Sequence, residues 1–379
     1  MPRVRLAVLL PLLLPIAAAG QTLRGTLLDD GSGAPLPAVL VDALRAADDS
    51  ALRRAATDAR GRFGFADIPA GRYRVRVNRI GFRPWVSAEF PLSPGQALDS
   101  VWRVASEAVV LSEIVVESES ACRSSLDDDR RMALVWDEAR KSLALLQRHG
   151  GGDSLEFIFT RTRIQVDTDG NRRVLGRFPG GGRGLWPITS QAPDSLAELG
   201  YVQPRDTLFG PIYYGPDPEV FFSDPFLQTH CFRLVPPPGD HPDWIGLGFR
   251  PVPERELSDI DGVLWLARQD ATLRRLEFRY TRLWSWVPAG RAGGSLEFAR
   301  LPSGQPVVVG WTIRAPIASR APATAGRRRS DARTEAFFGS GWTTLQGFLV
   351  EESRVEQVLG EGSRVLWTPS PDSGSSQPP

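Results

Sequence analysis

Histidine, cysteine and lysine are scarce in this chain of 379 residues, which has three histidines, two cysteines and one lysine, Lys141. His149, His230 and His241 share no common spacing, and no His-Glu-x-x-His or Gly-x-Ser-x-Gly motif occurs. Neither a zinc peptidase nor a serine hydrolase is therefore recognisable. We expect no enzyme activity, no catalytic residues, no cofactor and no metal site.

An excess of charge of either sign is also missing, since 45 basic residues face 44 acidic ones. This balance gives no electrostatic reason to expect nucleic acid or an anionic surface as a partner. The acidic pairs Asp259 with Asp261 and Asp217 with Glu219 could serve as glycosidase carboxylates or bind calcium. With 44 acidic residues such pairs are expected by chance, so we assign them no role.

Long apolar runs are absent beyond the N-terminus. Arg3 and Arg5 precede an apolar run at 6–16, and the small residues 17–20 follow it. This order predicts a signal peptide at residues 1–20, with a buried N-terminal helix as the alternative. No later stretch is long enough for a transmembrane helix. We expect an exported protein, located in the periplasm or associated with the outer membrane.

The two cysteines, Cys122 and Cys231, lie in a chain that we expect to be exported. In an oxidising compartment such a pair is most simply a disulfide. The alternative is a metal or redox site, but the two residues have no CxxC spacing. Closing a loop of this length would stabilise the fold by roughly 4–5 kcal/mol on the chain-entropy model.

Alternation of apolar and polar residues is clearest in the stretch 57–82. Phe63 and Phe65 alternate with small residues, and Tyr73, Val75 and Val77 alternate with arginines or polar residues. This period of two predicts two strands, each with one apolar face. Pro-Ala-Gly at 69–71 supplies the turn between them, so we expect an antiparallel pair.

The preceding residues extend the pattern into a longer motif. Asp29-x-x-x-Gly33-x-Pro35-Leu36-x-Ala38-x-x-Val41 is followed by Thr57-Asp58-x-x-Gly61-x-Phe63-x-Phe65 and then by Gly71-x-Tyr73-x-Val75-x-Val77-x-x-x-Gly81-Phe82. Residues 22–117 with this motif resemble the carboxypeptidase regulatory-like domain. The resemblance implies a seven-stranded, prealbumin-like β-sandwich and a cell-envelope setting. It implies little about function, because one fold hosts many activities.

The segment 111–116, Leu-Ser-Glu-Ile-Val-Val, ends this region. In outer-membrane receptors that carry the regulatory-like domain, a similar Leu-x-Glu-Val-Val-Val leads into a plug domain. We favour the alternative that residues 111–116 form the last strand of the sandwich. A linker at 118–126 then leads into a second domain at 127–367.

One long amphipathic helix is predicted at 125–149. Its apolar residues recur at three- and four-residue spacing: Met132, Val135, Trp136, Ala139, Leu143 and Leu146. Ser125 and Asp128 can cap its start, and Gly150 ends it. A helix with one apolar stripe must pack against another element.

That element is predicted to be a curved antiparallel sheet, so we expect a mainly β chain: a sandwich followed by an α+β domain. Strands are expected at 155–166, 172–178, 244–249, 262–266, 273–280, 295–301, 307–313 and 345–358. The strand pairs are similar to those of LolA-like periplasmic proteins. Loops are expected at 180–184, 210–218, 221–234, 236–240 and 315–333, and a disordered tail at 368–379. Arg327, Arg328 and Arg329 could contact phosphate or lipid headgroups, but such a run is usually solvated.

Two hypotheses about function follow. The first is an exported, non-enzymatic binding or scaffold protein that contacts envelope protein or glycan. The alternative is a periplasmic carrier that holds an apolar or lipid ligand in the curved sheet. The carrier hypothesis is motivated by the aromatic residues of the second half: Trp186, Trp244, Trp265, Trp284, Trp286, Trp311 and Trp342. Such residues usually fill cores, whereas a row of them on the surface would favour glycan stacking.

Overall fold

The computed structural model describes residues 21–111, 114, 122, 130–146, 155–184, 190–204, 210–320 and 342–369. The expected signal peptide at 1–20 lies outside the described residues, as do most of the expected linker and tail. Among the helices that are described, none combines the length and the apolar character needed to cross a bilayer.

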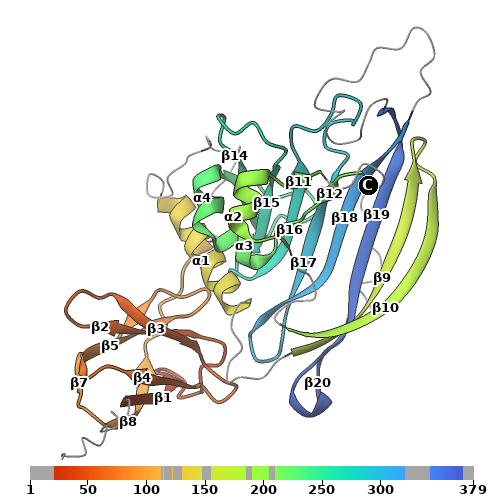
Figure 1. Cartoon of the computed structure of the whole chain (residues 1–379). Coiled ribbons are helices and arrows are strands. Elements are labelled where there is room, and N and C mark those ends of the chain that lie inside the picture. Colours follow the sequence, from red (N-terminus) through yellow and green to blue (C-terminus); the bar gives the residue numbers. More distant parts are fainter. Residues whose placement is uncertain are drawn as a thin grey trace, which may run out of the picture.

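Two sheets form a β-sandwich at the N-terminal end of the chain, which Figure 1 shows in orange. One sheet has the order β4 (Arg62–Ile68), β1 (Gln21–Asp29), β8 (Ala97–Val104). The other has the order β3 (Ala51–Ala56), β2 (Leu40–Arg45), β5 (Gly71–Asn78), β6 (Trp85–Val86), and β7 (Phe90–Leu92) also pairs with β5. The predicted mainly β fold class is confirmed, and β6 and β7 are short pieces along one edge of the sandwich.

The alternating apolar residues form the core between these sheets. Phe63 and Phe65 on β4 and Tyr73 and Val75 on β5 are all buried. The Tyr73 hydroxyl donates a hydrogen bond to the Pro69 carbonyl at 2.7 Å, so its polar end is satisfied at the turn. The sandwich therefore has its own core, as the alternation predicts.

A long, curved antiparallel sheet forms the second part of the molecule (Figure 1). Its strand order is β10 (Arg172–Gly184), β9 (Leu155–Asp167), β19 (Trp342–Leu359), β18 (Pro306–Arg320), β17 (Gly293–Arg300), β16 (Leu273–Tyr280), β15 (Ile260–Ala267), β14 (Trp244–Pro251), β13 (His230–Val235). The short strand β20 (Val365–Trp367) pairs with β19, and β11 (Val202–Gln203) pairs with β12 (Ile212–Tyr213) in a separate ribbon. Successive strands from β13 to β19 are antiparallel neighbours, so strands that follow one another in the sequence also pair in the sheet.

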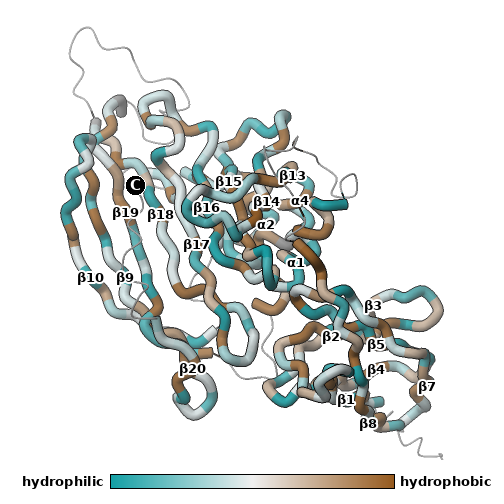
Figure 2. Tube along the Cα trace, turned by 180° about the vertical axis from the view of Figure 1, so that it is seen from behind, coloured by the Kyte–Doolittle hydropathy of each residue, from teal (hydrophilic) through white to brown (hydrophobic). Residues whose placement is uncertain are grey.

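Helix α1 (Arg130–Leu146) lies on the concave side of this sheet and contacts both β14 and β18. The expected apolar stripe is buried, including Val135, Ala139 and Leu143. Figure 2 shows the apolar segments of α1 and the nearby strands facing one another inside the molecule. The shorter helices α2 (Pro193–Leu199), α3 (Pro218–Phe222) and α4 (Asp224–Thr229) extend this layer. The helices thus lie on the side toward which the sheet curves.

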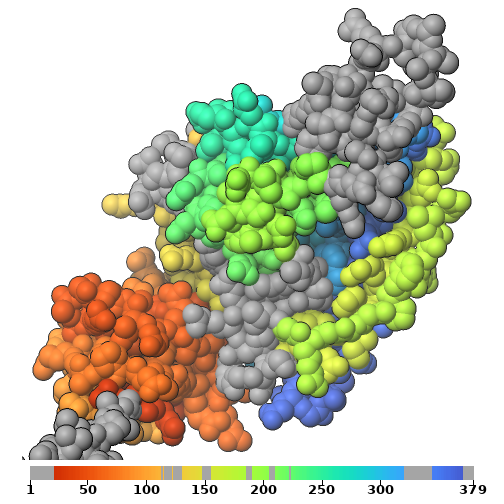
Figure 3. Space-filling view, viewed as in Figure 1, coloured from red at the N-terminus to blue at the C-terminus, as the bar shows by residue number. Residues whose placement is uncertain are grey.

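The second side of α1 faces the sandwich through two buried charged residues. The only lysine, Lys141, pairs with Glu138 at 2.6 Å, and both side chains are almost fully buried. Glu138 accepts a hydrogen bond from the Gly81 amide at 2.6 Å, and Lys141 donates one to the Phe82 carbonyl at 2.8 Å. This pair therefore joins the second domain to a single turn of the sandwich, which forms a lobe at one end of the molecule (Figure 3).

Several expectations about local structure are wrong. The last strand of the sandwich is β8, and Leu111 and Ile114, expected in a strand at 111–116, lie outside any strand and pack into the core that contains α1. Residues 180–184, expected as a loop, continue β10 because their backbone pairs with β9. The expected loop at 221–234 instead contains parts of α3 and β13 and the whole of α4.

Two further expectations are changed or fall outside the description. Strand β18 extends to Arg320, so the loop expected at 315–333 does not begin at Ala315. Helix α1 is described only over 130–146, so the caps expected at Ser125, Asp128 and Gly150 lie outside the described residues.

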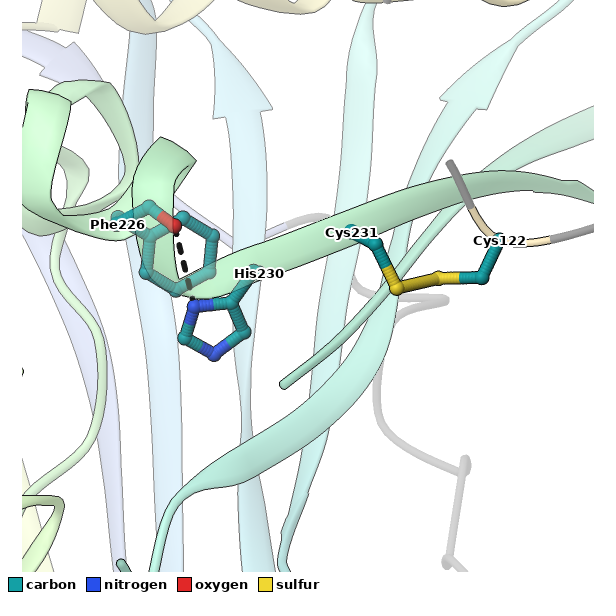
Figure 4. Close-up of a disulfide and its surroundings, with 4 residues drawn as sticks. All are labelled: Cys122, Phe226, His230 and Cys231. Carbon is teal, nitrogen blue, oxygen red and sulfur yellow. Dashed lines mark hydrogen bonds between the residues drawn. A yellow bond between two sulfur atoms is a disulfide. The ribbon is translucent and has the colours of Figure 1, made fainter. Parts of the chain in front are cut away.

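Strand β13 carries a disulfide and a buried polar cluster on adjacent residues (Figure 4). Cys231 is bonded to Cys122, and their Cα atoms are 5.5 Å apart. The neighbouring His230 stacks on Phe226 with ring centroids 3.9 Å apart. Because adjacent residues of a strand point to opposite faces, β13 is fastened on both sides.

The cluster around His230 is centred on Asp259, which is fully buried. One carboxylate oxygen lies 3.1 Å from His230 Nε2, and the other accepts from Arg255 Nε. Arg255 also donates to the carbonyls of Leu196 and Ala197, at 2.9 and 2.6 Å. The cluster thus ties α2 to β13 and to the start of β15.

We expect Asp259→Ala to lower the free energy of unfolding by about 3–5 kcal/mol, because it leaves Arg255 buried without its carboxylate. Burial raises the pKa of Asp259, but hydrogen bonds and charges from His230 and Arg255 outweigh this effect and hold the pKa below its usual value. A carboxyl with a lowered folded pKa stabilises the fold above its unfolded pKa and loses that contribution as the pH falls. Chemical denaturation between pH 7 and pH 2 measures both effects.

The matched control is Asp261→Ala, which removes a nearby carboxylate that pairs with Arg279 at the surface. Its effect should stay within about 1 kcal/mol. Two results would contradict the role given to the buried cluster. One is an equal loss of unfolding free energy in the two variants, and the other is an Asp259→Ala variant whose stability falls with pH as steeply as that of the wild type.

The disulfide gives a second prediction. The bridge joins residues that are 109 positions apart in the sequence, and reduction opens the loop that it closes. Reduction should therefore lower the free energy of unfolding by roughly 4–5 kcal/mol on the chain-entropy model. Calorimetry of oxidised and reduced full-length protein measures the difference, and the variant with both Cys122→Ser and Cys231→Ser should match the reduced protein. Two free thiols titrated in unfolded, non-reduced protein would rule the bridge out.

Candidate functional site

The two histidines that the structure describes lie in different surroundings. His149 lies outside the described residues, His230 is in the buried cluster, and His241 stacks on Trp244 with ring centroids 3.9 Å apart. No group of three or more histidine, cysteine, aspartate or glutamate side chains in the described part of the chain could hold a metal ion. The two described histidines thus share no site.

Three of the four acidic residues named from the sequence have structural partners. Asp217 caps α3 by accepting from the Val220 amide at 3.0 Å, and it also accepts from the Ser190 amide. Asp259 lies in the buried cluster, and Asp261 pairs with Arg279. These carboxylates therefore hold local structure. Arg327, Arg328 and Arg329 lie outside the described residues.

The tryptophans of the second domain do not form an exposed row among the described side chains. Trp265, Trp284 and Trp311 are buried, and Trp244 and Trp286 are half-buried. Trp186 and the side chain of Trp342 lie outside the description. Aromatic rings here mainly fill the core, so a stacking surface must be sought elsewhere.

A groove on the sandwich supplies such a surface. It has a volume of about 540 Å³ and lies beside β6, β7 and β8, where the edge strands of the two sheets face each other. Trp85, Phe90 and Trp102 contribute aromatic rings to its walls, and all three are half-buried. The groove thus presents rings that the core does not fully cover.

The position of Trp102 depends on a glycine in the neighbouring strand. Strand β8 alternates exposed and covered residues, which turns Trp102 toward the inside of the sandwich. A Cβ atom on Gly25 of β1 would lie only 2.0 Å from the Trp102 ring. The ring also packs against Phe63 and Phe90, with centroids 5.5 and 6.0 Å away. The indole therefore lies over β1 because residue 25 has no side chain.

Polar groups border these rings. Glu89 is held by Arg72, whose hydrogen bond is the main reason that the pKa of this carboxyl is lowered. Gln96 accepts from the Ser93 amide at 2.8 Å through its carbonyl oxygen, and Ser100 and Arg103 also line the groove. The groove therefore offers a fixed carboxylate acceptor, an amide and a guanidinium beside the aromatic rings.

This combination suits a ligand that has an apolar face and several polar groups at its edge. Ligand sites typically join aromatic walls to a few placed polar groups, and Trp can contribute a large apolar face at little cost in conformational freedom. A sugar ring has such a shape, with C–H groups on its faces and hydroxyls around its edge. The chemistry that the groove supports is binding.

The sequence analysis missed this groove. Its strands β6 and β7 have only two and three residues, too few for alternation to be detected. One signal was available: Trp85, Phe90 and Trp102 lie within eighteen residues at the end of the resembling segment. Only the pairing of β1 with β8 places Gly25 under Trp102.

The resemblance of the N-terminal region to a known family is confirmed. Residues 22–104 match the family model of the carboxypeptidase regulatory-like domain, so this match ends at the last residue of β8, before the boundary expected at 117. No curated protein matches the chain.

Several solved structures match with low TM-scores. A 5-hydroxyisourate hydrolase of Klebsiella pneumoniae has 23% identity and a TM-score of 0.19, with 23% of this chain and 92% of that chain covered. A provisionally assigned carbohydrate-binding protein of Bacteroides uniformis has 9% identity and a TM-score of 0.20, with 65% and 98% covered. A DUF3823 family protein of the same organism has 10% identity and a TM-score of 0.20, with 61% and 90% covered. The family match assigns residues 22–104 to a carboxypeptidase regulatory-like domain.

Proposed function

We propose that this chain is an exported, non-enzymatic binding protein of the cell envelope whose regulatory-like domain binds glycan in the aromatic groove. The observation that carries the proposal is the placement of Trp85, Phe90 and Trp102 in one open groove with a polar border. A buried core would cover these rings completely, and a catalytic site would need a placed acid, base or nucleophile beside them.

The polar border supports glycan over a purely apolar ligand. Glu89 is kept ionised by Arg72, so it can accept hydrogen bonds from sugar hydroxyls. Gln96 and Ser100 add groups that can both donate and accept. An apolar ligand would leave these groups without water or partners, which costs free energy.

The alternative, a carrier of an apolar or lipid ligand in the curved sheet, has less support. A carrier needs open space on the concave side, and α1 packs there against β14 and β18. Val135 and Ala139 of α1 are fully buried, and Leu143 is nearly so. Around β14 and β18 this side is therefore occupied by the side chains of α1, which suits a scaffold.

Export is part of the proposal and rests on two features. The residues 1–20 have the order of a signal peptide, and the disulfide of Cys122 with Cys231 suits an oxidising compartment. Envelope protein remains a second possible partner, and the binding experiment separates it from glycan.

The test uses purified full-length mature protein and a panel of neutral and acidic polysaccharides, with affinity measured by calorimetry or affinity electrophoresis. We expect saturable binding to at least one polysaccharide. Trp85→Ala should weaken it roughly tenfold or more, since truncating a central aromatic residue costs about 2 kcal/mol at a binding hot spot. Trp102→Ala should weaken it similarly, although its contact with Phe63 makes some loss of stability expected.

Trp244→Ala is the matched control, because it removes a half-buried indole from the second domain, outside the groove. It should leave glycan affinity unchanged. Binding that survives both groove substitutions, or that is lost equally in the control, would contradict the assignment of the groove. Binding only to an envelope protein would replace glycan as the partner.

A further inference from the structure

A second hollow lies between the sandwich and the second domain. It has a volume of about 680 Å³, which is within the usual range for small-molecule sites. The sandwich contributes the turn at 29–38 and the turn at 79–82, and the second domain contributes the turns at 269–270 and 300–304. We call this hollow the interdomain cleft.

The walls of the interdomain cleft are held at a fixed separation. Gly81 approaches the Asp270 carbonyl so closely that a Cβ atom would lie 3.2 Å from it, and a Cβ on Gly304 would lie 3.6 Å from Ala38. The buried pair of Glu138 and Lys141 forms hydrogen bonds with the backbone of Gly81 and Phe82. A ligand in the cleft would therefore meet a preformed site, which lowers the cost of binding.

Each domain contributes one arginine to this cleft. Arg79 Nη1 donates to Ser106 Oγ at 3.0 Å, and its guanidinium lies 3.9 Å above the Phe82 ring. Arg300 Nε donates to the Gly304 carbonyl at 3.1 Å. Among the described residues, most of the other N–H groups of these two guanidiniums have no protein acceptor within hydrogen-bond distance.

The carboxylates in the cleft are occupied by other donors. Asp29 accepts from the Ser32 amide, the Ser32 hydroxyl and the Ser106 hydroxyl, whereas Arg79 lies 3.5 Å away. Asp270 accepts from the amide and hydroxyl of Thr272, and Arg300 lies 3.7 Å away. The arginines are therefore only loosely paired with these acids.

The electrostatic surroundings agree with this geometry. Burial lowers the pKa of Arg79 and of Arg300, and the nearby carboxylates do not fully offset it. The charges of Arg274 and of Arg79 further lower the pKa of Arg300. Each guanidinium thus has one carboxylate as a long ion-pair partner, and the charge of Arg79 also acts on Arg300.

We infer that the interdomain cleft binds a small organic anion, whose carboxylate or phosphate group is held between Arg79 and Arg300. Guanidinium N–H groups match both oxyanions in geometry and form short, charge-assisted hydrogen bonds with them. The prolines at 35, 37 and 302 give the cleft apolar walls for the body of such a ligand. This site is separate from the aromatic groove and does not depend on the glycan proposal.

The test is calorimetric titration of the full-length mature protein with sodium glucuronate and, separately, with glucose 1-phosphate, at low ionic strength. Glucuronate carries a carboxylate and glucose 1-phosphate a phosphate, so the two titrations show which oxyanion the cleft prefers. We expect saturable binding of at least one, and no binding of uncharged glucose at this site. Absence of binding by both anions would overturn the inference, as would a response equal to that of sodium chloride at matched ionic strength.

Substitutions locate the binding. Arg79→Gln and Arg300→Gln should each weaken it about tenfold or more, since each removes one charged partner. Ser303→Trp should block the cleft from its exposed rim while keeping both arginines, so it tests the site even if an arginine variant folds poorly. Wild-type affinity in Ser303→Trp or in both arginine variants would overturn the inference.

The matched controls are Arg60→Gln in the sandwich and Arg354→Gln in β19, which remove exposed arginines outside the cleft. Both should bind the anion as the wild type does. Trp85→Ala should also leave anion binding intact, so failure of the groove proposal and failure of the cleft proposal can be told apart. Loss of binding in the Arg60 or Arg354 control would mean a general charge effect and would count against the cleft.

Discussion

The buried pair of Glu138 and Lys141 fixes how the two parts of the molecule meet. Removing these charges from water is costly, and burial is the main reason that the pKa of Glu138 is raised. Lys141 and the Gly81 amide oppose this shift, and the lysine also satisfies the Phe82 carbonyl. Such a pair contributes little net stability, but it accepts only one geometry. Helix α1 can therefore hold one turn of the sandwich in place.

The same contact explains how one helix serves two cores. The apolar stripe of α1 packs against the concave side of the long sheet. On its other side, Glu138 accepts a hydrogen bond from the turn at 79–82. Leu40 and Ile80 of the sandwich join the larger core around α1. Together with the approach of Gly81 to Asp270 and of Gly304 to Ala38, this contact sets the width of the interdomain cleft.

Patterns in the sequence predicted the parts of the fold where side chains alternate. Strand β16 has the predicted bounds because Leu276, Phe278 and Tyr280 face one side and charged residues the other. Strand β13 was missed because all six of its residues are buried, which leaves no alternation to detect. The end of β10 was missed because its glycines give no side-chain signal and normally disfavour strands.

The candidate site was less predictable, because it depends on pairings between distant residues. The role of Lys141 could not be read from its being the only lysine, since the Phe82 carbonyl that it binds comes from another domain. Likewise, nothing in the local sequence shows that Gly25 makes room for Trp102. The motif that identified the domain specifies its core, whereas the groove is built from residues at the edges of its sheets.

The two free edges of the long sheet show how a scaffold of this size can avoid pairing with other chains. An exposed edge strand is a template for unwanted β pairing, and charged side chains reduce that risk. Strand β10 carries Arg172, Arg173, Arg177 and Arg183, and no acidic residue. At the opposite edge, β13 is fastened by the disulfide at Cys231 and by His230 in the buried cluster. One edge is thus protected by charge and the other by covalent and polar attachment.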